Sequence, residues 1–480
     1  MTIPNYINGG WARASGAESL PIVDPATGDA LGRVPLSSRG DVAAAVAAGA
    51  KAFPGWRATP VVDRIAVLFR FKALLEDHIG ELAELMTREH GKTRDESAGE
   101  IKRGIESVMH ACAIPTLMMG ETLENIAAGV DCETIRQPLG VFAVVTPYNF
   151  PVMIPLWFWP FAVATGNTVV LKPSERDPLT HQRVVELAAQ AGLPAGVLNV
   201  VHGDRVAVDA LLEHPDIQGV SFVGSSAVAR SLYGAAAASG KRVQALGGAK
   251  NHMIVLPDAD LEATARAVVA SAYGAAGQRC LAGSIVVGVG EAYRPMRDAV
   301  LEGAAQLRLG HGLDPDVTMG PVISAAHRER VAGYVDAGER DGARLLLDGR
   351  RATVPKHPAG HWFGATVFEN VTPEMSLGRD EIFGPVAGLT RAGSLEEAIA
   401  LVHRNPYGNA ISLFTRSGAA AREFRFHAGI SMIGVNIGVV APMAFFPFGG
   451  SRGSFYGDLK AQGKDAIEFY TDKRVVISKW

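Results

Sequence analysis

The run Gly140-Val-Phe-Ala-Val-Val-Thr146 sets the architecture that we expect for the first half of this chain. It is short, apolar up to its threonine and followed by Pro147, which is typical of a parallel strand buried on both faces. Similar apolar runs cover 167–171, 197–201 and 219–223, and a helical stretch lies over 180–191. The alternation predicts a doubly wound α/β domain, whose ligands bind beyond the carboxyl ends of the strands.

Strand and helix patterns alternate again after residue 250. Asp258-Ala-Asp260 is a predicted N-cap for a helix that runs toward Tyr273, and Ser284-Ile-Val-Val287 is a predicted strand. We therefore predict a second α/β domain, with its boundary at the glycine-rich turn 245–250. The other elements expected from the pattern are an early helix over 64–82, a later helix over 397–403, and strands over 411–414 and 430–435.

The composition is that of a folded globular protein with more than one domain. The chain has 480 residues, of which 48% are hydrophobic and 20% charged. Its net charge of −3 includes no basic block, so we expect no nucleic-acid partner. The apolar run 150–164 is shorter than the ~20 residues of a membrane helix and carries three prolines, so we expect a buried helix and no membrane span. Three cysteines and a start without a secretory signal favour the reducing cytoplasm.

The segment Gly274-Ala-Ala-Gly-Gln-Arg-Cys280 carries the best candidate for a nucleophile. Its small residues leave room for a substrate, and a thiolate attacks a carbonyl carbon. Arg279 is a cation that lowers the pKa of a neighbouring thiol. The other cysteines, Cys112 and Cys132, have no such setting, and the spacing of the three suggests no metal site. A buried structural cysteine is the alternative for Cys280.

Two loops at predicted strand ends are candidates for cofactor binding. Gly224 and Ser225 lie between a strand and a helix, where free N–H groups attract phosphate oxygens, although the usual G-x-G-x-x-G pattern is absent. Lys172 and Glu175 end another strand and can hydrogen-bond ribose hydroxyls. A plain turn and a solvated loop pair are the respective alternatives.

The chain resembles the NAD(P)-dependent aldehyde dehydrogenase superfamily from end to end. The segments that carry the resemblance are Thr146-Pro-Tyr-Asn-Phe-Pro151, 166–175, 192–200, 222–225, Gly277-Gln-Arg-Cys280, 319–321, Glu381-Ile-Phe-Gly-Pro-Val386 and Asn405-Pro-Tyr-Gly-Asn409. The resemblance implies that Cys280 attacks an aldehyde to form a thiohemiacetal. It also implies that the Asn149 amide and the Cys280 N–H hold the oxyanion, and that hydride transfer leaves a thioacyl enzyme.

The same resemblance implies a nicotinamide cofactor site. A carboxylate at Glu175 repels a 2′-phosphate, which favours NAD over NADP. One departure is Ala229, where the family often has glycine, so the helix must pack there with an extra methyl group. The residues implied to bind the cofactor are Thr146, Phe150, Lys172, Glu175, Gly224, Ser225, Glu381 and Phe383.

A second departure concerns the release of the product. Hydrolytic members usually carry a water-activating glutamate in a Glu-Leu-Gly-Gly-Lys segment, whereas this chain reads Ala245-Leu-Gly-Gly-Ala-Lys-Asn-His252. Aligned on the lysine, Leu246 replaces the glutamate and cannot take a proton. This pattern, Gly277–Cys280 and the last twelve residues resemble the coenzyme A-acylating methylmalonate-semialdehyde dehydrogenases. The resemblance implies oxidation of malonate or methylmalonate semialdehyde to acetyl- or propionyl-coenzyme A with loss of CO2.

Such a substrate carries a carboxylate and needs a cationic partner. Arg279 adjoins the nucleophile, and Arg103 lies on a predicted helix and matches the second arginine of the subfamily. Two guanidinium groups can hold one carboxylate bidentately. The alternatives are a solvated or ion-paired Arg103, and an Arg279 that serves mainly to lower the pKa of Cys280.

The expected architecture has three parts. An NAD-binding domain covers 1–120 and 140–245, a catalytic domain covers 246–455, and a β-extension of 121–139 and 456–480 builds a homodimer or homotetramer. Two other hypotheses stay open: a hydrolytic dehydrogenase of another acidic aldehyde, distinguished by its independence of coenzyme A, and a binding protein on a dehydrogenase scaffold, excluded by any NADH formation.

Overall fold

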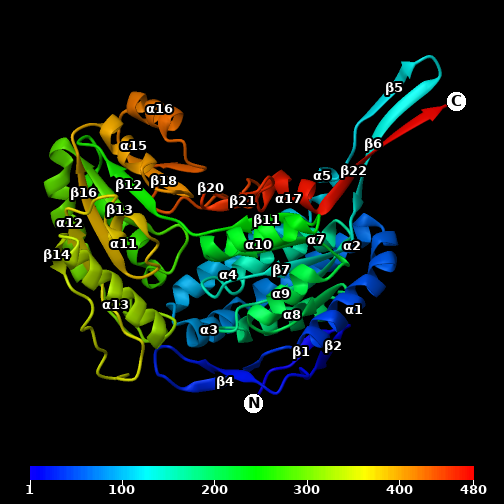
Figure 1. Cartoon of the computed structure of the whole chain (residues 1–480), viewed down its shortest axis with the longest axis horizontal. Coiled ribbons are helices and arrows are strands. Elements are labelled where there is room, and N and C mark those ends of the chain that lie inside the picture. The colour runs from blue at the N-terminus through cyan, green and yellow to red at the C-terminus, as the bar shows by residue number, and fades with distance from the viewer.

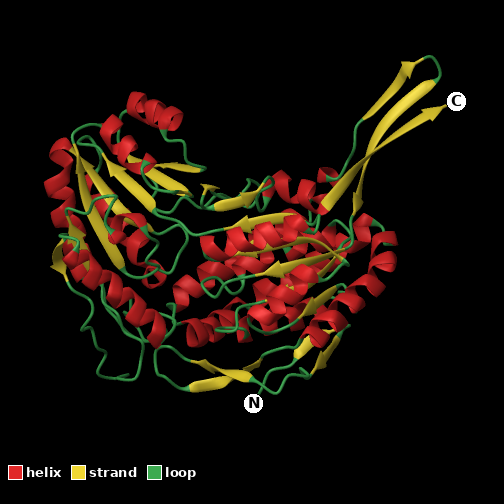
Figure 2. Cartoon of the chain, viewed as in Figure 1, coloured by secondary structure: helices red, strands yellow, loops and turns green.

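The computed structural model describes residues 1–480. Two α/β bodies lie side by side, and a thin β-arm with the C-terminus projects from the one that contains the N-terminus (Figure 1). Helices cover the sheets of both bodies (Figure 2). The predicted α/β class with two doubly wound sheets and a small β-extension is confirmed.

The first sheet has the strand order β2-β1-β9-β8-β7-β10-β11-β21. Its central strands pair in parallel, and β1, β2 and β21 are antiparallel edges. The bounds are β1 (Asn5–Ile7), β2 (Gly10–Ala12), β7 (Val141–Val145), β8 (Thr168–Lys172), β9 (Leu198–Val200), β10 (Ile217–Val223), β11 (Arg242–Leu246) and β21 (Phe455–Gly457). All four predicted strands of this half are therefore present.

Strand β7 shows why its sequence is apolar throughout. Val141, Ala143 and Val145 pack into one core, whereas Phe142 and Val144 pack into another. Successive side chains of a strand point to opposite faces, so both faces of the sheet are buried. The first core is shared with α1 (Arg39–Ala58), α9 (Arg205–Glu213) and α10 (Ser226–Ala238), and the second with α2 (Val61–Asp77), α3 (Ile79–His90), α4 (Arg94–Ala111), α7 (Trp159–Ala164), α8 (Leu179–Gln190) and α17 (Gly463–Tyr470).

Two predicted helices are each broken in two. The stripe over 64–82 belongs to α2 and α3, because the backbone leaves the helical conformation at His78. The run 150–164 forms α6 (Met153–Leu156) and α7, with Pro160 in the first turn of α7, where its missing N–H is tolerated. The run is buried as expected. None of the helices is both long and apolar enough to span a membrane.

The second sheet has the order β14-β15-β16-β13-β12-β18-β19, and only β14 is antiparallel to its neighbour. Asp260 caps α11 (Leu261–Tyr273) as predicted, because its side chain accepts a hydrogen bond from the Ala263 N–H. The strands are β12 (Asn251–Val255), β13 (Gly283–Val289), β14 (Arg344–Leu347), β15 (Thr366–Glu369), β16 (Val386–Ala392), β18 (Ala410–Phe414) and β19 (Met432–Val435). The other main helices are α12 (Tyr293–Ala305), α13 (Ala325–Arg340), α15 (Leu395–His403) and α16 (Gly418–His427).

The β-arm consists of β5 (Thr122–Ala127), β6 (Val130–Pro138) and β22 (Thr471–Lys479). Strand β22 pairs with β6 along its whole length, from Thr471 opposite Pro138 to Lys479 opposite Val130. The arm is smaller than the predicted extension. Strand β21 pairs with β11, and α17 packs into the first body through Phe469 and Tyr470, so only the end of the 456–480 segment lies in the arm.

The remaining short elements join these units. They are β3 (Ser19–Val23), β4 (Ala30–Pro35), α5 (Ile114–Leu117), α14 (Ser376–Arg379), β17 (Tyr407–Gly408) and β20 (Ser451–Arg452). The turn 247–250 passes from the last parallel strand of the first sheet, β11, to β12 of the second. The predicted glycine-rich turn therefore leads from one sheet to the other.

Candidate active site

The segment before Cys280 has an unusual backbone. After α11, Ala275, Ala276 and Gly277 all adopt left-handed conformations, with φ of 51°, 53° and 71°. A Cβ on Gly277 would overlap the carbonyl group of Gly384, so only glycine fits at this position. Such backbone strain persists only where the surroundings enforce it, and it is common at functional sites.

Side chains from both sheets fix the nucleophile. Asn251, at the start of β12, and Asn409, just before β18, each donate a side-chain N–H to the carbonyl oxygen of Cys280, at 2.8 and 2.9 Å. Asn149, on the loop after β7, donates to the carbonyl oxygen of Gln278 at 3.1 Å. The structure therefore brings Asn149 of the first body to the segment of the second body that carries Cys280.

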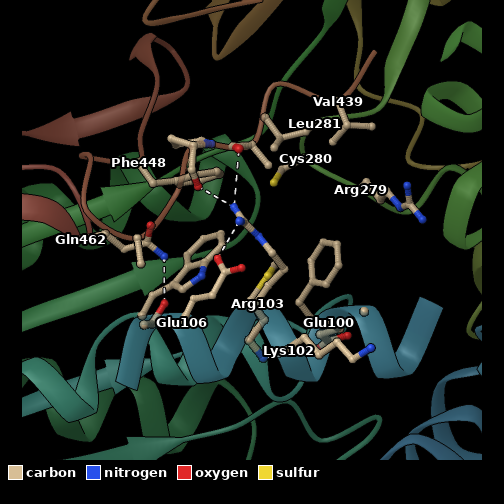
Figure 3. Close-up of a pocket in the computed structure, with 18 of the residues that line it drawn as sticks. Glu100, Lys102, Arg103, Glu106, Arg279, Cys280, Leu281, Val439, Phe448 and Gln462 are labelled. Atoms are coloured by element: carbon tan, nitrogen blue, oxygen red, sulfur yellow. Dashed lines mark hydrogen bonds and ion pairs between the residues drawn. The ribbon is translucent and has the colours of Figure 1, made fainter. Parts of the chain in front are cut away.

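Cys280 lines a cavity of about 490 Å³. One part of its wall is apolar and includes Phe150, Met153, Trp157, Leu281, Val439 and Phe448. Helix α4 forms the charged part with Glu96, Glu100, Lys102, Arg103 and Glu106. Residues three and four apart on a helix share one face, which explains how one helix supplies so many polar side chains. Figure 3 shows this face of α4 opposite Cys280.

Both predicted carboxylate-binding arginines line this cavity, but they do not converge. Arg103 donates to Glu106 at 2.6 Å and to the carbonyl oxygen of Pro442 at 2.5 Å. Arg279 donates to Glu96 at 2.9 Å. The guanidinium group of Arg103 reaches into the cavity, and that of Arg279 points away from it (Figure 3). Each arginine is thus paired with an acid of α4.

A third ion pair lies behind the cavity. Lys92 and Glu100 are in contact with almost fully buried side chains, and Lys92 also lies over the ring of Phe150, 4.2 Å from its centroid. Glu100 further accepts hydrogen bonds from the N–H groups of Val152 and Met153 at 2.9 and 3.1 Å. Glu96, Glu100 and Glu106, the three carboxylates of the cavity wall, are therefore all ion-paired.

Arg279 lowers the pKa of Cys280, as expected, but the net shift of that pKa is upward. Burial raises the pKa of the Cys280 thiol to about 12, and the negative charge of Glu381 adds to the rise. Backbone N–H groups and Arg279 lower the pKa, but by less. Burial therefore outweighs the charge of Arg279, which is itself paired with Glu96.

The predicted cofactor residues of the first body gather at one edge of its sheet. Thr146 follows β7, Lys172 ends β8, and Gly224 and Ser225 follow β10, so all lie at carboxyl ends of parallel strands. Lys172 and Glu175 form an ion pair at 3.0 Å. Burial opposes the ionisation of Glu175, but Lys172, the backbone N–H of Glu175 and Arg176 together outweigh it and lower the pKa.

This edge fits a dinucleotide. The buried hydroxyl of Thr146 has no hydrogen-bond partner, and Ser225 begins α10 without capping it, which leaves the N–H groups of the helix free for phosphate oxygens. A Cβ on Gly224 would overlap the ring of Phe222, so glycine keeps the space before α10 free of a side chain. Ala229 is completely buried in the core beneath α10, so the extra methyl group is accommodated.

Glu381 and Phe383 come from the second body. Glu381 accepts a hydrogen bond from the Ala249 N–H at 3.0 Å, in the turn that joins the two sheets. Burial raises the pKa of Glu381 to about 7. Phe383 adopts a left-handed φ of 60°, and its ring packs edge-on against Tyr148. Both residues therefore lie beside the loops that carry Asn149 and Cys280.

Leu246 provides no polar group to the site. It ends β11, is 3% exposed and belongs to the core against which Cys280 packs. Sequence reasoning missed Glu96, Glu106, Asn251 and Asn409 as neighbours of the site. Thr93-x-x-Glu96 is a capping-box pattern that marks the start of α4, but the pattern contains no information on the pairing with Arg279.

An α/β scaffold, a cysteine on a strained loop beside an asparagine amide, and a dinucleotide-fitting sheet edge together define an aldehyde-oxidising dehydrogenase. The profile of the aldehyde dehydrogenase family matches residues 11–476, and the chain belongs to this family.

Similar proteins within the family carry the names of malonate- or methylmalonate-semialdehyde dehydrogenases. The chain is 50% identical to malonate-semialdehyde dehydrogenase 1 of Geobacillus kaustophilus, over all of this chain and 98% of the relative. It is 44% identical to a proposed methylmalonate-semialdehyde dehydrogenase of Sinorhizobium meliloti in complex with NAD, with a TM-score of 0.99 over all of this chain and 98% of that one. A methylmalonate-semialdehyde dehydrogenase of Oceanimonas doudoroffii is also 44% identical, with a TM-score of 0.98 and the same coverage.

Proposed function

We propose that this enzyme oxidises malonate semialdehyde or its methyl homologue with NAD and releases the product to coenzyme A. Malonate semialdehyde, coenzyme A and NAD⁺ give acetyl-coenzyme A, CO2 and NADH. The observation that carries the proposal is the catalytic cavity itself, in which Cys280 lies opposite an apolar wall and Arg103, and which Arg279 also lines. The names of the similar proteins point to the same substrates.

In this proposal Cys280 attacks the aldehyde carbon after its thiol loses a proton. The developing oxyanion would lie between the Cys280 N–H and the Asn149 amide, which donates to the Gln278 carbonyl oxygen before the substrate binds. NAD would be the hydride acceptor. The residues that would hold it are Thr146, Lys172, Glu175, Gly224, Ser225, Glu381 and Phe383, with Phe150 nearby. Loss of hydride from the thiohemiacetal leaves a thioester on Cys280.

The charges of the cavity favour a thiol over water as the final acceptor. Activation of water needs an unpaired base near the thioester. Glu96, Glu100 and Glu106 are held in ion pairs, and Leu246 replaces the usual glutamate. A thiol is itself a good nucleophile, so coenzyme A resolves the thioester with less help from a base.

Glu381 supports one alternative, a hydrolytic dehydrogenase that yields a free acid. Its pKa is raised to about 7, which suits a general base, and its charge acts on Cys280. We favour the coenzyme A reaction because Glu381 also belongs to the proposed cofactor site. There its carboxylate would bind the nicotinamide ribose and would not be free to activate water. Dependence of turnover on coenzyme A separates the two functions.

We also propose a homo-oligomer in the cytoplasm. The arm exposes Leu123, Ile126, Val475, Ile477 and Trp480, although an isolated protein seldom leaves so many apolar side chains on one small sheet. A second copy would cover them. All three cysteines are free, which fits a reducing compartment.

Substitution of Arg103 tests the proposed substrate class. We expect Arg103→Leu to raise KM for malonate semialdehyde by about tenfold to a hundredfold, because hydrogen bonds between charged groups are lost. KM for propanal, which has no carboxylate, should change little. Steady-state NADH formation measures both. Equal effects on the two aldehydes would remove Arg103 from carboxylate binding.

A further inference from the structure

Glu96 accepts hydrogen bonds from three residues around the catalytic loop. One of its carboxylate oxygens accepts hydrogen bonds from the Ala275 N–H at 2.7 Å and from Arg279 at 2.9 Å. The other oxygen accepts from the N–H and the hydroxyl of Thr93, both at 3.1 Å. One side chain therefore ties the start of α4 to the strained segment before Cys280 and to the arginine beside it.

Arg279 lies in the wall between two cavities. Both Arg279 and Glu96 line the catalytic cavity, and both also line a second cavity of about 920 Å³ beside α11 and α12. Their side chains are each 19% exposed. A Cβ on Gly274 would overlap the guanidinium group, so the sequence leaves space for Arg279 in its present position. Glu96 is the acid bonded to Arg279 there.

The two arginines of the cavity differ in how they are held. Arg103 donates to main-chain carbonyl oxygens as well as to Glu106, so an acid is only one of its restraints. The hydrogen bond found for the Arg279 guanidinium group is the one to Glu96, and its buried Nε atom has no partner. A carboxylate that binds Arg279 must therefore compete with Glu96.

We propose that Glu96 is a positioning residue. Its ion pair with Arg279 competes with a substrate carboxylate and thereby sets how strongly the catalytic cavity binds that carboxylate. The proposal rests on the proposed function, since it concerns an acidic aldehyde. Glu96 neutralises Arg279 in the empty cavity and yields part of the guanidinium group when a substrate carboxylate enters. The hydrogen bond to the Ala275 N–H keeps the catalytic loop in place meanwhile.

Alkylation of Cys280 tests this without turnover. Iodoacetate carries a carboxylate and iodoacetamide does not, so the ratio of their rate constants reports the attraction of the cavity for a carboxylate. Glu96→Gln removes the charge and keeps one acceptor oxygen, enough for the Ala275 N–H, while its NH2 group replaces the oxygen that accepts from Thr93. We expect this variant to raise the iodoacetate-to-iodoacetamide ratio about two- to fivefold, the range of a partly exposed ion pair. Mass spectrometry of the Cys280 peptide separates this reaction from that of Cys132.

Asp95→Asn is the matched control. Asp95 is exposed, lies in the same first turn of α4 and has the same charge, but it has no contact with Arg279. Its ratio should equal that of the wild type. An unchanged ratio in Glu96→Gln would overturn the proposal. An equal rise in Asp95→Asn would also overturn it, because a general change in charge would then explain the result.

Steady-state kinetics separate this proposal from the proposed function. Glu96→Gln should lower KM for malonate semialdehyde about two- to fivefold and leave KM for propanal unchanged. If the wild type does not prefer the acidic aldehyde, the proposed function fails. If it does and the ratio of the two KM values is the same in the variant, Glu96 has no part in the selection.

Discussion

Cys280 is protonated at neutral pH in this structure because burial and the charge of Glu381 raise its pKa to about 12. Because the thiolate is disfavoured, a higher pH is needed to remove the proton from the Cys280 thiol. We therefore expect the rate of alkylation by iodoacetamide to rise steadily with pH up to at least pH 9, without a plateau near neutrality. A plateau below pH 7 would show a stabilised thiolate and contradict this electrostatic account.

Glu381→Gln should lower the pKa of Cys280, because it removes the negative charge that opposes the thiolate. Alkylation at pH 8 should then be faster than in the wild type. Glu369→Gln provides a control, since Glu369 is buried and paired with Arg344 and Arg297 in the second body. An equal acceleration in both variants would assign the effect to loosened packing.

At the scale of single residues, the sequence predicts what lies within one segment better than what meets through space. Cys280 and Asn149 are identifiable because their own segments carry the family pattern, and the structure brings them together. The pairing of Glu96 with Arg279 joins residues 183 positions apart, and no local pattern contains it. The net rise in the pKa of Cys280 has no local signal either, because it comes from burial and from the charge of Glu381 on another element.

At the scale of elements, the loop 274–280 contains three consecutive residues in the left-handed conformation. Gly277→Ala adds a Cβ to a residue with a left-handed backbone conformation, and this Cβ overlaps the carbonyl group of Gly384. We expect a loss of about 1–3 kcal/mol in the free energy of unfolding and a fall in kcat of about a hundredfold, because a small displacement of a nucleophile is costly. Chemical denaturation and NADH formation measure the two effects.

Gly55→Ala is the control for this substitution. Gly55 lies inside α1, and a Cβ there would have nothing within 4 Å. Alanine in a helix interior is more favourable than glycine by about 0.5–1 kcal/mol, so the control should be neutral or slightly stabilised. Full activity in Gly277→Ala would mean that the conformation of the loop is unimportant for Cys280.

Strands were predicted more accurately than helices in this chain. Buried parallel strands such as β7 and β8 are short apolar runs with turns at both ends, which the sequence displays directly. The break at His78 between α2 and α3 leaves the apolar stripe intact on both sides, so periodicity alone cannot reveal it. The break in the run 150–164 has a local signal in its prolines.

At the scale of the whole molecule, contacts within one chain do not explain the exposed apolar side chains of the arm. Val475 and Ile477 are 63% and 69% exposed and lie on one face of β22, two residues apart. We expect the double variant Val475→Glu, Ile477→Glu to dissociate the proposed oligomer, because charges would replace the apolar contact. Light scattering coupled to size exclusion measures the mass.

Val62→Glu is the control, since Val62 is 59% exposed on α2, in the body of the protein. It should keep the mass of the wild type. A monomeric wild type, or a double variant of unchanged mass, would contradict the role of the arm in assembly. The sequence predicted a β-extension built from 121–139 and 456–480, but the start of α17 and the position of β21 depend on contacts with the first sheet.

The most direct test of the proposed function is NADH formation from malonate semialdehyde and NAD, with and without coenzyme A. The paired state of Glu96, Glu100 and Glu106, together with Leu246, predicts that sustained turnover requires coenzyme A and yields acetyl-coenzyme A. Full turnover without coenzyme A, with a free acid as product, would contradict the account and identify a water-activating base in the site, for which Glu381 is the first candidate.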